Sequence, residues 1–258
     1  MKGVLIDGVT YDDLFELEGV DVVTAKPFKA RARNRPVTRA VIHESVTLDA
    51  DVATDMDTTE RILRRKGYGV HVMCDAGDGQ LVQHNDLSKD TVIHASGFNV
   101  NSIGIEVVTP YYGHLLKPGM PWTRVIDAPW AHKKKYVVPT IEQLSTLVRF
   151  LQAITEVQAG NVYVPRLWPG MHETRVCAED NLTLTKRTMA MSRIDGLTKQ
   201  DIRTVPGIWA HAYTEHADGC FPVLFCWLVM EHGCSHADAY ELAIELASGA
   251  RQTVPLPD

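Results

Sequence analysis

The segment from Ser102 to Val108 limits the possible folds more than any other part of this chain. Its residues, SIGIEVV, place β-branched side chains on both faces of an extended strand. Such a strand must be covered on both faces, so it belongs in the interior of a sheet. A second apolar strand is predicted from Arg39 to His43. Together they predict an α/β or α+β fold with a central mixed β-sheet flanked by helices.

The clearest helix follows Thr140, which is predicted to cap it together with Gln143 three residues later. Apolar residues recur at helical spacing from Ile141 to Ile154, and this stripe is interpreted as core. The Asp-Gly-rich sequence at 75–79 predicts a hairpin. The other expected elements are a strand at Val4 to Ile6, hairpin strands at Tyr68 to Cys74 and Gln80 to Gln83, a strand at Pro206 to Tyr213, and helices at Asp57 to Lys66, from Pro222, and from Ser235 to Gly249.

A chain of 258 residues with 45% hydrophobic and 22% charged residues is long enough for a sizeable core. One domain with additions fits better than two domains. Residues 1–36 are predicted to form an N-terminal extension, and residues 37–258 the main domain. Two parts of that domain are interpreted separately: 109–138 as a long surface loop, and about 161–204 as an insertion.

The formal net charge of -6 gives no support for nucleic-acid binding, which normally needs a basic surface. The basic run His132 to Lys135 is interpreted as a solvated loop, with contact to an anionic polymer as the alternative. The N-terminus has no apolar stretch typical of a signal peptide, so synthesis and retention in the cytoplasm are expected. The apolar run from Pro222 to Met230 is far shorter than the ~20 residues that span a bilayer, so no membrane insertion is expected.

Two histidines are predicted to end strands, and a cysteine follows the second. His43 alone is more typical of a hydrogen-bonded structural residue. His211 ends a second strand, however, and Cys220 follows it after a loop. Two histidines and a thiolate form a three-ligand zinc shell with an open fourth position, which is typical of hydrolytic sites. The five cysteines, an odd number without C-x-x-C spacing, indicate neither a disulfide framework nor a four-cysteine zinc site.

The order of these pieces resembles that of the type-2 N-acetylmuramoyl-L-alanine amidases, which share a fold with peptidoglycan-recognition proteins and amidase-type phage lysozymes. The third matching block is the most specific, because His-Ala, a Gly/Asn loop and Ser-Ile-Gly-Ile-Glu follow in the family's order. The matching blocks are AVIHESVT (40–47), GVHVMCDAGDGQLVQ (69–83), VIHASGFNVNSIGIEVV (92–108), TIEQLSTLVRFLQAI (140–154) and GIWAHAYTEHADGC (207–220).

The resemblance implies an enzyme that hydrolyses the amide bond between N-acetylmuramic acid and L-alanine in peptidoglycan. It implies Zn²⁺ held by His43, His211 and Cys220, with Glu106 as the catalytic acid and base. The alternative for Glu106 is a salt-bridged acid at the end of a strand.

Three further residues are expected to line the substrate groove: His94, Asn101 and His71. His71 has two open alternatives, a position beside the metal ligands or plain core packing.

The sequence departs from the family at the last ligand. Many relatives carry a lysine two residues before it, where this chain has Asp218. His216 or Tyr68 is predicted to supply the missing donor to the oxyanion. Some relatives use an aspartate as the last ligand, but Cys220 is preferred here, because a thiolate binds zinc more tightly and this cysteine precedes a predicted helix start. The alternative for Cys220 is a buried apolar cysteine.

A monomeric phage-type endolysin that reaches the cell wall after release by another factor is the expected role. The alternatives are a non-catalytic peptidoglycan-binding module and a cytosolic amidase that recycles soluble muropeptides.

Overall fold

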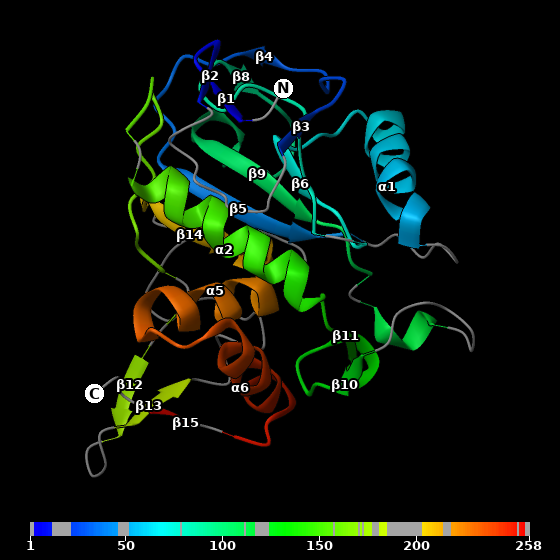
Figure 1. The fold of residues 1–258 in the computed structure, drawn as a ribbon, viewed down its shortest axis with the longest axis vertical. Coiled ribbons are helices and arrows are strands. Elements are labelled where there is room, and N and C mark those ends of the chain that lie inside the picture. The colour runs from blue at the N-terminus through cyan, green and yellow to red at the C-terminus, as the bar shows by residue number, and fades with distance from the viewer. Residues whose placement is uncertain are drawn as a thin grey trace.

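The computed structural model is organised around a six-stranded central sheet (Figure 1). The residues it describes are 3–11, 22–45, 52–77, 79–110, 112–116, 124–156, 158–169, 171, 173–176, 181–184, 203–213, 218–251 and 253–255.

The central sheet is mixed, as the sequence predicts. Its first four strands run parallel, the fifth is antiparallel to the fourth, and the sixth is parallel to the fifth. Every residue of the second and third strands is buried, and the interior position predicted for the third strand is confirmed. In spatial order the strands are β14 (Gly207–Ala210), β5 (Arg39–Glu44), β9 (Ser102–Val107), β6 (Val72–Cys74), β7 (Leu81–Gln83) and β3 (Val22–Thr24).

Helices cover the two faces of this sheet unequally. The Cys74 thiol contacts the Gln143 carbonyl of α2 (Ile141–Glu156), and α2 packs in turn on α5 (Cys220–His232). Met73 points to the opposite face, where Met56 and Leu63 of α1 (Val52–Lys66) pack on the same small cluster. The last helix, α6 (His236–Ser248), lies outside α5 (Figure 1). Most of the core therefore lies between the sheet and α2, α5 and α6.

The predicted cap of α2 is present. The Gln143 backbone N–H donates to Thr140 Oγ1 at 3.2 Å, and Gln143 Oε1 accepts from the Thr140 backbone N–H at 3.1 Å. This reciprocal pair is a capping box. The Ser235 hydroxyl accepts from the Asp238 N–H, and Gly249 ends α6 in a left-handed conformation.

Some predicted boundaries were wrong. Residues 109–138 are not one continuous loop, because β10 (Val125–Asp127) and β11 (Lys135–Val137) pair antiparallel within them. Burial of Tyr136 and Val137 in the core is the physical reason. The segment also contains the 3-10 turns η2 (Gly113–Leu115) and η3 (His132–Lys134). Two helices begin earlier than predicted, α1 at Val52 and α5 at Cys220.

The first 36 residues are partly built into the sheet. Strand β3 forms its edge beside β7, while β1 (Val4–Ile6) pairs with β2 (Val9–Tyr11), and β4 (Arg31–Ala32) pairs with β8 (Asp90–Thr91). In the region of the predicted insertion, β12 (Glu173–Val176) and β13 (Asn181–Leu184) form a small sheet with β15 (Thr253–Pro255). Among the described residues, no helix is long and apolar enough to cross a membrane.

Candidate metal centre and active site

The parallel pairing of β14 and β5 brings two histidines together at the carboxyl ends of these strands. Ala210 is the register partner of Ile42, so the next residues, His211 and His43, lie side by side. Their ring centroids are 4.1 Å apart, and both side chains are buried. His211 begins the 3-10 turn η4 (His211–Tyr213), which turns the chain away from the sheet.

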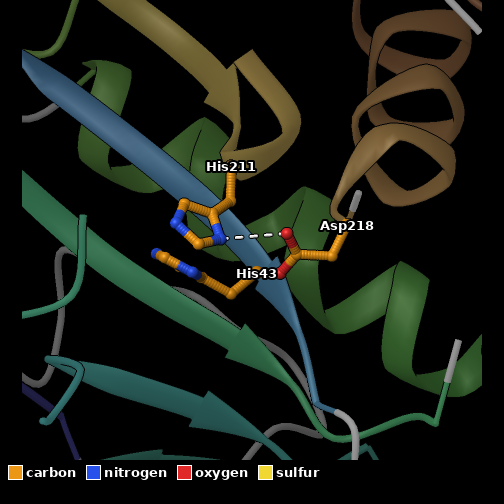
Figure 2. Close-up of side chains that lie close together, drawn as sticks. All are labelled: His43, His211 and Asp218. Carbon is orange, nitrogen blue, oxygen red and sulfur yellow. Dashed lines mark hydrogen bonds and ion pairs between the residues drawn. The ribbon is translucent and has the colours of Figure 1, made fainter. Parts of the chain in front are cut away.

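Asp218 completes this group (Figure 2). Its Oδ1 lies 2.9 Å from His211 Nδ1, and its Oδ2 accepts from the Glu44 backbone N–H at 3.2 Å. One ligand atom from each of His43, His211 and Asp218 lies within 4.8 Å of the other two. The three residues come from β5, the turn after β14 and the residues before α5, so tertiary folding alone assembles them.

Cys220, the expected third ligand, is not a member of this group within the part of the chain that the structure describes. It is the first residue of α5, one residue beyond Gly219, which adopts a left-handed φ of 82°. A Cβ at Gly219 would lie 2.1 Å from the Ile42 carbonyl oxygen, so glycine is required at this close approach. Burial, and then the charges of Glu44 and Asp218, raise the pKa of the Cys220 thiol well above its ordinary value. The described geometry therefore brings Asp218 into the group with the two histidines and does not bring Cys220 there, and Cys220 as a ligand stays a prediction.

Glu106 lies on the same face of the sheet as His43. The two residues are register partners in the parallel pair β5 and β9, so their side chains project to the same side. Glu106 is buried, and this burial, together with the charges of Asp218 and Glu44, raises the pKa of its carboxyl well above the ordinary value. A carboxyl group with such a raised pKa is suited to exchanging a proton near neutral pH.

A second buried carboxyl, Glu44, was not singled out from the sequence. Its side chain accepts hydrogen bonds from the Tyr136 hydroxyl and, at 2.8 Å, from the Gly219 N–H. Burial is the main cause that raises the pKa of Glu44 to about 8. Glu44 could have been noticed in the sequence, because a charged residue inside a buried strand needs a hydrogen-bond partner. Nothing in the sequence marks Tyr136 as that partner. Glu44 ties the turn that holds Asp218 to the end of β5.

His94 reaches the site across Gly104. A Cβ at Gly104 would lie 2.7 Å from His94 Cγ, so this glycine leaves the space that the imidazole fills. His94 Nδ1 lies 3.1 Å from His43 Nε2, and His94 Nε2 lies 2.9 Å from the Ser102 hydroxyl. Both ring nitrogens thus contact other side chains of the protein, and the substrate contact of His94 stays a prediction. Burial, followed by the charges of His71 and His211, lowers the pKa of His94 well below its ordinary value.

The structure does not bring the other predicted site residues into the group. His71 is fully buried, its Nδ1 accepts from the Gly104 N–H at 3.0 Å, and its ring centroid lies 6.0 Å from that of His94, so core packing and a position beside the ligands both stay open. Asn101 precedes β9, whereas Glu106 is near its other end, so the strand separates them by about 16 Å. Tyr68 follows α1 with 51% of its surface exposed. His216 lies outside the described residues.

The candidate group fits a zinc ion by its donor chemistry. Two imidazoles and one carboxylate, all buried, form a three-ligand set of the kind that hydrolytic zinc sites use, with a further coordination position left for a reactant. The buried carboxyl of Glu106 lies on the same face of the sheet.

One family profile matches the chain. The profile of a family described as N-acetylmuramoyl-L-alanine amidase matches residues 33–167, which include His43, His94 and Glu106. No curated protein sequence matches the chain.

Similar solved structures include a peptidoglycan recognition protein, PGRP-Hd, from Alvinella pompejana (16% identity, 58% of this chain and 88% of that chain, TM-score 0.36). Drosophila PGRP-SD has 16% identity over 53% of this chain and 75% of its own, with a TM-score of 0.37. The endolysin and N-acetylmuramoyl-L-alanine amidase LysCS from Clostridium intestinale URNW has 15% identity over 53% of this chain and 74% of its own, with a TM-score of 0.32.

Proposed function

Because the chain belongs to the N-acetylmuramoyl-L-alanine amidase family, we propose that it hydrolyses the bond between N-acetylmuramic acid and L-alanine in peptidoglycan with the help of one zinc ion. The observation that carries this proposal is the buried group of His43, His211 and Asp218 on the sheet face that also presents Glu106.

In this proposal, zinc is held by the two imidazoles and the Asp218 carboxylate. Bound zinc would lower the pKa of a water molecule and polarise the scissile carbonyl. The chain itself contributes the fixed positions of the ligands. His43 is held by its strand, and Asp218 by its contacts with His211 and the Glu44 N–H. Ligands fixed in advance lose little entropy when the ion binds.

Glu106 is the proposed proton carrier. Its carboxylate form accepts the proton from the attacking water, and the resulting carboxyl returns that proton to the leaving amine of L-alanine. A site with low exposure to water favours this role, because the carboxyl keeps a high proton affinity there.

A non-catalytic binding module needs neither a buried ligand set nor a carboxyl with a raised pKa beside it. Their joint presence favours the enzyme. Glu106→Gln is the decisive substitution, since it keeps the shape of the side chain but cannot carry the proton. It should retain zinc and lose activity by roughly 10² to 10⁴. Glu142→Gln, on the first turn of α2, is the matched control and should leave the rate unchanged.

The metal ligands are tested by zinc content per chain. His43→Ala and His211→Ala should each remove both zinc and turnover. Asp218→Asn should also empty the site, whereas Cys220→Ser should keep it filled. The opposite result for the last two substitutions would make Cys220 the third ligand. Wild-type protein that holds well under half an equivalent, with no recovery on added zinc, would overturn the zinc proposal.

The physiological substrate is decided by two assays run side by side, each with and without a chelator. Loss of turbidity of purified sacculi would support the endolysin role. Release of peptide from a soluble muropeptide alone would instead indicate a recycling amidase. Binding to sacculi without release in either assay would refute the enzyme and favour a recognition module.

A further inference from the structure

We infer that Ser102 and His94 form a positioning pair that holds His43 in the one neutral tautomer whose Nδ1 carries the lone pair for a metal. This inference rests on the proposed function in one respect, that His43 binds zinc. The pair itself is argued from a continuous series of hydrogen bonds that begins at a backbone carbonyl.

The series begins at Phe98, whose carbonyl oxygen can only accept. The Ser102 hydroxyl lies 2.7 Å from it and must therefore donate its single hydrogen to it. Ser102 Oγ then has only lone pairs to offer to His94 Nε2, which lies 2.9 Å away. His94 must donate from Nε2, and in a neutral imidazole its Nδ1 is then an acceptor.

The next bond passes the same constraint to His43. His94 Nδ1 is an acceptor and lies 3.1 Å from His43 Nε2, so His43 must carry its hydrogen on Nε2. The lone pair of a neutral His43 is therefore on Nδ1. Metal-binding histidines characteristically donate their second ring N–H to a fixed acceptor, which sets the tautomer and the orientation of the ring. Here the fixed acceptor is another imidazole.

The protein holds this pair rigidly. Asn99 Oδ1 accepts the backbone N–H of both His94 and Ala95 at 2.8 Å, which fixes the backbone that carries the imidazole. Gly104 supplies the space beneath the ring, and Ser102 is fully buried at the start of β9. The series starts at the carbonyl of Phe98, the residue before η1 (Asn99–Asn101), and Ser102 is fixed at the start of β9. Neither histidine can therefore change its tautomer without breaking a hydrogen bond.

The first test reads the tautomers directly in zinc-free wild-type protein by long-range ¹H–¹⁵N correlation spectra at a pH where both rings are neutral. We expect the Nε2–H tautomer for both His94 and His43. An Nδ1–H tautomer of either ring would overturn the inference. This measurement needs no variant and no activity.

The second test compares zinc affinity by competition with a chelator. His94→Leu removes the acceptor and should weaken zinc binding by about 10 to 100-fold. His94→Asn should restore most of the affinity, because its Oδ1 takes the place of Nδ1 as acceptor. Ser102→Ala should give an intermediate loss, since His94 is then able to adopt either tautomer.

His84→Leu is the matched control, because His84 is also a buried histidine with a hydrogen bond from its ring to a carbonyl, that of Lys26. It should leave zinc affinity unchanged. Wild-type zinc affinity in His94→Leu would overturn the positioning role. Failure of the wild-type protein to bind zinc would overturn the proposed function, and the tautomers would then be decided by the spectra alone. Cobalt-substituted protein gives a further readout, because loss of ring orientation should change the visible spectrum in His94→Leu and not in His84→Leu.

Discussion

Replacing Gly104 by alanine tests how closely the sheet, His94 and His43 depend on one another. The added methyl group would lie 2.7 Å from His94 Cγ and 2.9 Å from His94 Nδ1. Carbon atoms in contact normally lie 3.5 to 4.0 Å apart, so the ring must move by roughly 0.8 Å. The backbone of His94 cannot follow cheaply, because Asn99 holds it by two hydrogen bonds.

Two losses are expected in Gly104→Ala. Overpacking of a close-packed site costs about 1 to 3 kcal/mol of unfolding free energy. A displacement of that size also breaks the 3.1 Å bond between His94 and His43, so zinc should bind at least about tenfold more weakly. At a fixed excess of zinc, a tenfold loss removes about 1.4 kcal/mol of the stabilisation that the metal provides.

Urea unfolding with and without zinc separates the two losses. Ile105→Val is the control, because Ile105 is on the same strand but points to the opposite face, and it should cost about 0.5 to 1.5 kcal/mol with no change in zinc affinity. If Gly104→Ala binds zinc as tightly as the wild type, the argument that this glycine makes room for a positioning histidine is refuted.

Three further outcomes are expected. The free energy of unfolding of Glu44→Gln in urea should lie within about 1 kcal/mol of the wild-type value, whereas Glu44→Leu leaves the Tyr136 hydroxyl without its acceptor and should lower that free energy by about 1 to 3 kcal/mol. Equal losses in the two variants would refute the role of the hydrogen bonds. Burial, and then the charge of Arg33, lowers the pKa of His71 from 6.5 to about 3, so the stabilising contribution of neutral His71 is fully present above pH 6.5 and is lost as the pH falls toward 3. Unfolding free energy should fall there by up to about 1.4 kcal/mol per pH unit, and His71→Asn should flatten this slope; an unchanged slope would assign the loss to other groups. Thr140→Ala should cost about 1 kcal/mol in thermal unfolding by removing the cap of α2, and Thr140→Ser should not; equal stability of the two variants would contradict the capping role.

Local chemistry predicted much of the fold and part of the site. An apolar strand that is buried on both faces can only lie inside a sheet, so the central position of β9 followed from its side chains alone, and β5 was predicted as a strand. The capping box of α2 was readable because its two partners are three residues apart. His43 was identified at the end of a strand, whereas Glu106 was implied by the resemblance to the amidase family, and the register that places both on one face comes from the pairing of their strands.

Only the tertiary structure decided which residues meet across long distances in the chain. Asp218 and Cys220 are two residues apart, and their order in the sequence favoured the cysteine. The turn at Gly219 and the Glu44 N–H direct Asp218 toward His211 instead, and a strand 174 residues away supplies that N–H. The sequence by itself determined the two central strands β5 and β9, the cap of α2 and the histidines at the strand ends, because these depend on neighbours within a few residues. Which of the two residues joins the histidines depends on where a loop side chain points, and that direction is set by contacts that exist only after the sheet has formed.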